Sequence, residues 1–494
     1  MMQARAAVIL AAAPSLGGIA MDPRTRVLLE APIWPTLLRL ALPNLVVMLM
    51  QASIGLIETY FVAKLGTDAL AGMALVFPIL MLFQMVSAGA MGGGILSAVA
   101  RALGSGRPHD ANILAWHAVA VAVGLGLATS LAVLAGGPRL YALMGGRDAS
   151  LTAALSYSNV VFAGAILLWL FNSLAAVIRG TGNMFVPASV TAAGAVILIP
   201  VSPALIFGWG PLPHLGIIGG AVAVLSFYAA GSVIYAAFIW SGRGVLRPPL
   251  RLPLLAWAPT REILRVGAAS SLVSVTTNVS IATATALAGV YGPAAVAGYG
   301  TGARLEYLLV PLVFALGAPL GAMVGTAIGA GRPERAVRVA WSGAVIAGAL
   351  TGAIGLAGAF FPYGWLSLFG DDATMNEVGA QYLRIVGPFY GFFGTGLALY
   401  FASQGAGRLG GPLVAAGLRL ALAAAGGWVA SLFFGLTGVF AALALALAAF
   451  GLVNAAAIAG GAWSGRVTRP RDAEDPGSGQ VAALACAAGK DGLS

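Results

Sequence analysis

Two acidic side chains, Glu58 and Glu306, lie inside long apolar stretches of this sequence and stand clear of its loops. An ionisable group within a membrane-spanning stretch costs about 3 kcal/mol or more, so it is a functional candidate by default. A carboxyl group removed from water can exchange a proton near neutral pH, or bind Na⁺ together with neighbouring oxygens. We therefore expect Glu58 and Glu306 to be cation-coupling residues.

Each acid also has a structural interpretation. Glu58 could lie near the outer end of its membrane-spanning helix and pair with Lys64. However, long cationic side chains reach the membrane–water interface more easily than a short acidic one does. Glu306 could instead form an ion pair with an arginine of a neighbouring helix. The candidate arginines are Arg304, Arg384 and Arg419.

Polar residues accompany Glu58 at helical spacing. Asn44, Gln51 and Glu58 lie seven positions apart, which places them on nearly one face of a helix, and we expect this face to line a cavity. A second polar face either lines the substrate path or forms hydrogen bonds between helices: Ser271, Ser274, Asn278 and Thr285. Isolated polar residues within apolar stretches are further cavity candidates: Gln84, Asn172 and Tyr390.

The sequence offers no support for enzymatic or metal chemistry. Its three histidines are scattered without metal-ligand spacing, and its single cysteine, Cys486, excludes a disulfide framework. No Ser-His-Asp set can be argued, and the glycine-rich runs lack the strand context of phosphate-binding loops. We expect no enzyme activity, no metal and no cofactor. Any active transport would therefore use an ion gradient.

The composition is that of a helical membrane protein. Of 494 residues 60% are hydrophobic and only 9% charged, and the mean hydropathy is +0.93. Soluble proteins carry about 25% charged residues. The net charge of +10 comes from arginines in short loops, which fits membrane topology and not nucleic-acid binding.

Hydrophobic runs long enough to cross a bilayer recur along the whole chain, so we predict an all-α polytopic fold with twelve transmembrane helices. They are placed at 36–62, 69–102, 110–137, 150–178, 184–208, 214–240, 261–290, 295–329, 337–367, 374–404, 412–435 and 437–463. Arginines gather in the loops on the side of the two chain ends, Arg179 among them. By the positive-inside rule both termini are cytoplasmic, in a plasma (inner) membrane.

The chain repeats itself with a constant offset of 225 residues. ALGSGRP at Ala102 returns as AIGAGRP at Ala327, and RGTGNMFVP at Arg179 returns as QGAGRLGGP at Gln404. Six spans per copy is an even number, so the two six-helix lobes share one orientation and are related by a pseudo-two-fold axis along the membrane normal. Glu58 has no acidic counterpart in the second copy, where Thr283 stands.

Five regions follow from this organisation. We expect a cytoplasmic leader over 1–33, within which 1–20 reads as a mis-assigned start and not as a cleaved secretory signal. The N-terminal lobe covers 34–240, a Pro- and Arg-rich cytoplasmic linker 241–259, and the C-terminal lobe 260–465. The polar remainder, 466–494, is expected to be a disordered cytoplasmic tail.

With these motifs in view, the chain resembles the multidrug and toxic compound extrusion (MATE) family. The likeness extends from Pro35 to Arg466 and rests on LALPN, IETYFVAKLGTDALAGMAL, ARALGSGRP, IRGTGN and GTAIGAGRPERA. The resemblance implies two lobes around a central cavity, alternating access, and exchange of a substrate, often a lipophilic cation, for H⁺ or Na⁺. It places Glu58 where many members carry an aspartate, and Glu306 at an acid found in some branches.

One departure from the family pattern bears on the coupling ion. Many members carry Asn and Asp on the fifth span, where this chain has Leu198 and Ser202. Fewer carboxylates make Na⁺ coordination in the first lobe less favourable and favour H⁺, with Gln51, Ser202 and Asn172 as the neighbours of Glu58.

We therefore predict a secondary active exporter of small cationic or lipophilic compounds, acting as a monomer in the lipid bilayer by antiport with H⁺ or Na⁺. The alternative within the same superfamily is a lipid-linked glycan flippase, which would need a cationic cavity, with Arg304, Arg384 and Arg419 as its candidates. A membrane protein without transport activity is a weaker alternative, because it would not explain the duplication.

Overall fold

The computed structural model describes residues 22–209, 213–251, 253–370 and 372–463, apart from the side chains of 49 and 51–58. The expected start segment 1–20 and tail 466–494 lie outside the described residues. The described part of the chain is helical and contains no strand. This confirms the predicted all-α class.

The first half contains the short helix α2 (Pro23–Glu30) and the longer helical elements that follow it. They are α3 (Ile33–Ala63), α4 (Thr67–Gln84) with the π-helical η1 (Met85–Met91) and α5 (Gly92–Gly104), α6 (Pro108–Leu143), α7 (Asp148–Ala163), α8 (Ala165–Gly180), α9 (Phe185–Phe207) and α10 (Ile217–Trp240). Helix α2 is held to the second half by Arg335, whose guanidinium donates to the carbonyl oxygens of Leu28 (3.1 Å) and Ala31 (2.7 Å).

The second half repeats this plan. Its elements are α11 (Trp257–Gly289), α12 (Pro293–Gly329), α13 (Pro333–Phe360), α14 (Pro362–Leu366), α15 (Ala373–Val386), the 3₁₀ turn η2 (Gly387–Phe389), α16 (Tyr390–Ala406), α17 (Gly410–Ala421), the π-helical η3 (Leu422–Gly426) and α18 (Gly427–Ala459). Within α18, Gly435 has φ 58° and ψ −142°, a backbone conformation that breaks the helix into two legs.

The described helices account for the predicted spans. Nine stretches are long and apolar enough to cross a membrane, and α7 with α8, bent by 49°, forms a tenth. The stretch from Gly410 to Ala459 provides two crossings, because the helix breaks at Gly435. Helix α3, with 31 residues, is long enough to provide the remaining crossing. Each half of the chain thus supplies six crossings.

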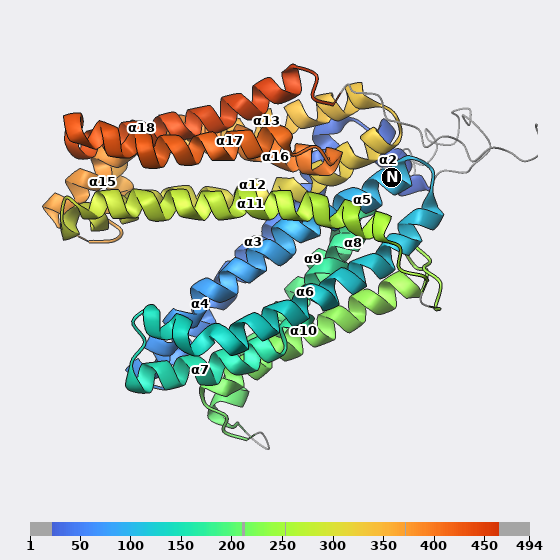
Figure 1. Ribbon diagram of the computed structural model, residues 1–494, viewed down its shortest axis with the longest axis horizontal. Coiled ribbons are helices and arrows are strands. Elements are labelled where there is room, and N and C mark those ends of the chain that lie inside the picture. The colour runs from blue at the N-terminus through green and yellow to red at the C-terminus, as the bar shows by residue number, and fades with distance from the viewer. Residues whose placement is uncertain (1–21, 210–212, 252, 371, 464–494) are drawn as a thin grey trace, which may run out of the picture.

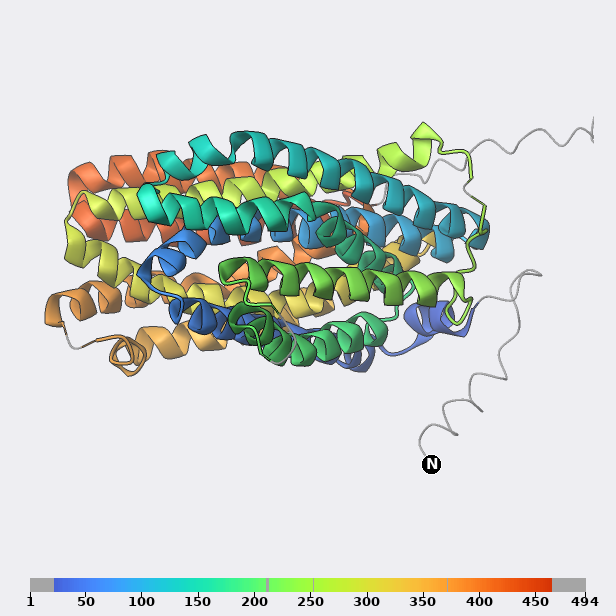
Figure 2. The same ribbon diagram turned by 90° about the horizontal axis from the view of Figure 1, so that it is seen from below.

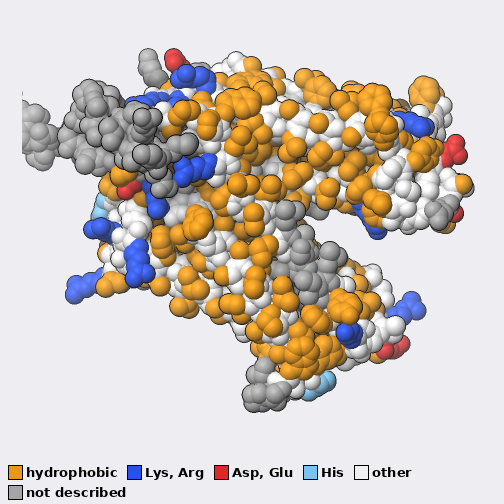
Figure 3. All heavy atoms as spheres, turned by 180° about the vertical axis from the view of Figure 1, so that it is seen from behind, with side chains coloured by type: hydrophobic (Ala, Val, Ile, Leu, Met, Phe, Trp, Pro, Cys, Tyr) orange, Lys and Arg blue, Asp and Glu red, His pale blue; other side chains and the backbone are white. Residues whose placement is uncertain are grey.

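The two halves form separate lobes that meet at one end and diverge at the other. In Figure 1, α3 to α10 make the lower arm and α11 to α18 the upper arm, and the arms join near α2 and α5. Figure 2 shows the helices of both lobes running along the same long axis. The hollow between the arms is visible from behind in Figure 3, where Lys and Arg side chains gather at the joined end.

The joined end is a close crossing of α5 and α12. A Cβ on Gly104 would lie 2.1 Å from the carbonyl oxygen of Thr326, and a Cβ on Gly329 would lie 2.2 Å from that of Arg101. Only glycine permits this approach of two backbones. Arg101 adds bonds from its guanidinium across the lobes, to the carbonyl oxygen of Gly405 (2.9 Å) and to Glu262 (2.8 Å).

Candidate functional site

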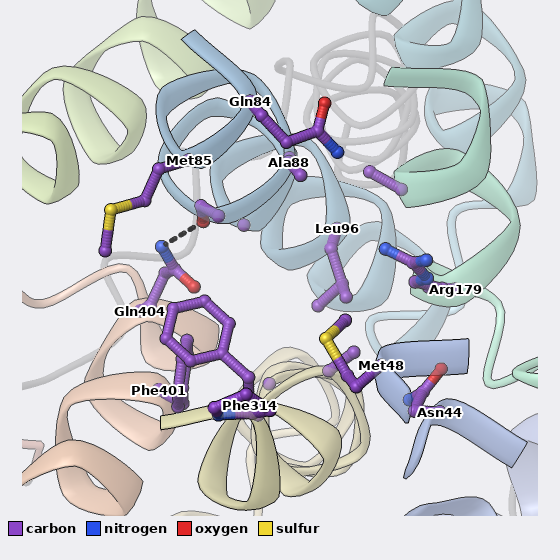
Figure 4. Close-up of a pocket in the computed structure, with 18 of the residues that line it drawn as sticks. Asn44, Met48, Gln84, Met85, Ala88, Leu96, Arg179, Phe314, Phe401 and Gln404 are labelled. Carbon is purple, nitrogen blue, oxygen red and sulfur yellow. Dashed lines mark hydrogen bonds between the residues drawn. The ribbon is translucent and has the colours of Figure 1, made fainter. Parts of the chain in front are cut away.

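A pocket of about 350 Å³ lies between the lobes, beside the α5–α12 crossing. Its walls come from α3, α4, η1, α5 and α8 of the first lobe and from α12 and α16 of the second. Most of the surface is apolar, with Met48, Met85, Phe314 and Phe401 as its larger side chains (Figure 4). A pocket shared by two lobes that separate at one end is placed to bind a ligand that passes between them.

Two of the predicted cavity residues line this pocket. Asn44 is 4% exposed and donates to the carbonyl oxygen of Ala315 at 3.4 Å, so it also bridges α3 to α12. Gln84 accepts a hydrogen bond from Asn172 at 3.2 Å, and Asn172 also donates to Ser87 at 2.8 Å. Asn172 is therefore a buried residue behind the wall that orients Gln84.

Sequence reasoning missed Arg179 as a pocket residue because it placed this arginine in a cytoplasmic loop. Arg179 lies in the last turn of α8, and its guanidinium points into the pocket (Figure 4). Its counterpart in the repeat, Gln404, lines the same pocket. The constant 225-residue offset was the available signal, because equivalent residues of two lobes face each other across a pseudo-two-fold axis.

Glu306 lies away from this pocket, in the interior of the second lobe. Its carboxylate accepts from Arg419 at 3.3 Å and from the hydroxyl of Tyr382 at 3.1 Å. The Arg419 side chain is 7% exposed and lies 5.2 Å from the ring centroid of Phe393. A cavity of about 30 Å³ adjoins this pair. Of the three arginine partners considered for Glu306, the structure selects Arg419.

The other predicted cavity residues do not line the central pocket. Ser274 and Asn278 lie on α11, where Asn278 donates to the sulfur of Met85, a pocket residue, at 3.8 Å. Tyr390 is fully buried in the core of the second lobe. Ser202 is buried on α9, which packs along α3, and its hydroxyl has no hydrogen-bond partner among the described residues.

The remaining arginines considered from the sequence are also outside the pocket. Arg304 is exposed and lies over the ring of Phe369, 5.0 Å from its centroid. Arg384 lies 5.7 Å from the centroid of Tyr363. Arg304 was expected in the cavity, but its side chain is exposed on α12 and lies over Phe369 instead. The side chains of Glu58 and Gln51 lie outside the described residues, so their roles stay predictions.

Comparison with known proteins defines the class. The family model MatE matches residues 43–204 and 269–429, which fall in the two lobes and cover more than half of the chain. The chain is thus a multi-pass membrane transporter and belongs to the MatE family. This confirms the resemblance read from the motifs.

Relatives and solved structures agree with this assignment. The chain is 30% identical over 386 residues to a FAD transporter of Shewanella oneidensis, covering 76% of this chain and 82% of the relative. It is 25% identical to a probable multidrug resistance protein NorM of Thermotoga maritima, over 76% and 81% of the two chains. A MATE crystal structure in the bent conformation superposes with a TM-score of 0.81 at 22% identity, covering 88% and 96%.

Proposed function

We propose that this chain is a secondary active exporter, located in the plasma (inner) membrane, that moves small and largely lipophilic compounds by antiport with H⁺ or Na⁺. The observation that carries the proposal is the central pocket between two repeats of a MatE-family protein. The glycine crossing joins the lobes beside the pocket, and the lobes diverge at the opposite end, where Figure 3 shows a hollow between them. Reversal of this arrangement would deliver a ligand across the membrane.

The coupling proton is assigned to Glu58, with Glu306 as a separate second site. Glu58 belongs to α3, which contributes Asn44 and Met48 to the pocket wall. The hydroxyl of Ser202, on the neighbouring helix α9, is buried and has no hydrogen-bond partner among the described residues, so it is a candidate polar neighbour of Glu58 in the same lobe. A proton that binds to such a group and leaves on the other side would bias the lobes between their two arrangements.

The pocket walls fit the lipophilic part of the expected substrate. The described lining residues include no carboxylate, so they support the cationic part less well. One relative is named a FAD transporter and others multidrug exporters, which extends the candidate substrates to flavin dinucleotides. The lipid-linked glycan flippase is less favoured, because Arg304, Arg384 and Arg419 do not line the described pocket. Arg179 is the one arginine among its described lining residues, short of the strongly cationic cavity that a lipid diphosphate would need.

The test is transport by the full chain in proteoliposomes. Ethidium or FAD should move only when a pH or Na⁺ gradient is imposed, and the active gradient identifies the coupling ion. We expect Glu58→Gln to bind substrate with unchanged affinity but to lose uphill export by about tenfold or more. Glu377→Gln, at an exposed acid of α15, is the matched control and should transport normally. Uphill export by Glu58→Gln at the normal rate would refute the assignment.

A further inference from the structure

Arg179 is a cation in the wall of the central pocket, and none of the ion pairs among the described residues includes it. Its Nε is shut off from solvent and has no hydrogen-bond partner among the described residues. None of the described lining residues is acidic. A donor that is shut off from water without a partner costs about 1–3 kcal/mol. Such a group is therefore poised to gain from any anion that enters the pocket.

The equivalent residue of the second lobe shows the contrast. Gln404 is neutral, and its amide donates to the carbonyl oxygen of Gly89 (3.1 Å) and to the hydroxyl of Ser270 (2.8 Å). The first of these bonds is drawn in Figure 4. Gln404 thus joins the two lobes, and its amide nitrogen uses its donors within the protein. Arg179 occupies the equivalent position in the first lobe, but its guanidinium donates no hydrogen bond to the described residues.

A second donor faces the pocket. The Gln84 side-chain oxygen accepts from Asn172, and this assignment leaves its Nε2 directed to no described residue. The polar part of the wall thus presents N–H groups from Arg179 and Gln84, while its apolar part includes Phe314 and Phe401. One cavity therefore combines N–H donors that can bind a phosphate or carboxylate with aromatic rings that can stack on a planar group.

We infer that the pocket binds a soluble organic anion, with a phosphate or carboxylate group on the guanidinium of Arg179 and a planar apolar body against Phe314. This inference rests on the proposed export function and names its substrate class. It replaces the cation expected from the family resemblance by an anion. A guanidinium can hold such a group through two parallel hydrogen bonds, which a lysine ammonium cannot reproduce.

The experiment compares FMN with riboflavin, which share a flat ring system and differ by one phosphate. Binding to the purified full chain in zwitterionic lipid nanodiscs is followed by flavin fluorescence. We expect FMN to bind at least about tenfold more tightly than riboflavin, as a charge-assisted contact predicts. Arg179→Gln should remove this preference and leave riboflavin affinity within about twofold, because it deletes only the anion contact.

Two further variants separate the anion contact from folding and from net charge. Arg179→Lys should keep part of the FMN preference, since the positive charge remains although the paired N–H groups of the guanidinium are lost. Arg338→Gln, at an exposed arginine on α13, removes one charge outside the pocket and should change neither affinity. Retained riboflavin binding reports a folded pocket in each variant.

Several results would overturn the inference. One is that the wild-type protein binds FMN and riboflavin with equal affinity. Another is a dissociation constant for FMN above about 1 mM. A third is that Arg179→Gln weakens the binding of both ligands equally. The proposed export function would fail separately, through gradient-independent movement of dye in proteoliposomes. A normal gradient-driven exporter without FMN preference would refute the anion site alone.

Discussion

The ion pair between Glu306 and Arg419 is the best-defined charged contact inside the second lobe. The carboxylate is enclosed by Arg419 and Tyr382, and the guanidinium lies between the rings of Phe393 and Phe450. Both charges have lost most of their water, with side-chain exposures of 14% and 7%. The pair is therefore expected to be costly to break and less costly to replace as a unit.

Neutralising one partner alone leaves the other charge buried. Arg419→Met should lower the stability of the folded protein by about 3 kcal/mol or more, whereas Glu306→Gln combined with Arg419→Met should recover most of that loss. Thermal unfolding of the purified protein in detergent measures both. A single variant as stable as the wild type would show that the pair is not structural. Loss of pH-dependent transport in a stable Glu306→Gln would assign the coupling proton to Glu306.

At the residue scale the sequence identified the acids but not their surroundings. Glu306 was recognisable as an isolated acid, and Arg419 was one of three partners considered. The choice among them needed distances between helices, which no spacing along one chain supplies. Arg179 was misplaced for a related reason, because the end of α8 reaches the pocket although its sequence reads as a loop.

At the element scale, the decisive feature is the crossing of α5 and α12. Gly104 and Gly329 occupy equivalent positions of the two repeats, and each lies against a backbone carbonyl of the other lobe. The repeated motifs containing Gly104 and Gly329 made the equivalence visible in the sequence. The contact itself was not predictable, since it joins opposite copies of the repeat.

Adding a single methyl group should prevent this crossing from closing. Gly104→Ala places a Cβ where the Thr326 carbonyl oxygen already lies, so the lobes must part at this end and approach each other at the other. Spin labels at Leu143→Cys and Leu368→Cys, exposed positions of the two lobes, report this change. In a Cys486→Ser background, we expect electron paramagnetic resonance to measure a shorter mean distance.

A matched control is available on α6. Gly124 has no atom within 4 Å of an added Cβ, so Gly124→Ala should leave the label distance unchanged. An unchanged distance in Gly104→Ala would mean that the crossing does not govern which end of the molecule is closed.

At the scale of the whole molecule, the duplication is visible in backbone dihedral angles that recur at equivalent glycines of the two lobes. Gly216 and Gly435, which precede the sixth crossing of each lobe, have φ 57° and ψ −138°, and φ 58° and ψ −142°. Other glycines with positive φ also occur in equivalent turns: Gly66 and Gly292, Gly106 and Gly331, Gly145 and Gly370, Gly182 and Gly407, Gly242 and Gly461. The repeat therefore predicted the fold well, because turns that require glycine fix where helices end.

The orientation of this fold in the membrane is a further prediction. Arg147 lies between α6 and α7, at the separated ends of the lobes (Figure 1), and Arg338 lies near the start of α13, which follows the α5–α12 crossing at the joined end. Lys and Arg side chains gather at the joined end (Figure 3). In a Cys486→Ser background, a membrane-impermeant maleimide on intact cells should label Arg147→Cys and spare Arg338→Cys until the membrane is permeabilised. The positive-inside rule gives this direction. The reverse pattern would place both chain ends outside.

The bonds made by Arg101 break the symmetry of an otherwise two-fold crossing. Its counterpart in the repeat is Thr326, so this charged contact between the lobes exists on one side of the pseudo-axis only. Glu262, its partner, is 48% exposed and within reach of dissolved ions. Screening by salt weakens such a pair. We therefore expect higher ionic strength at the joined end to weaken this contact between the lobes, independently of substrate and coupling ion.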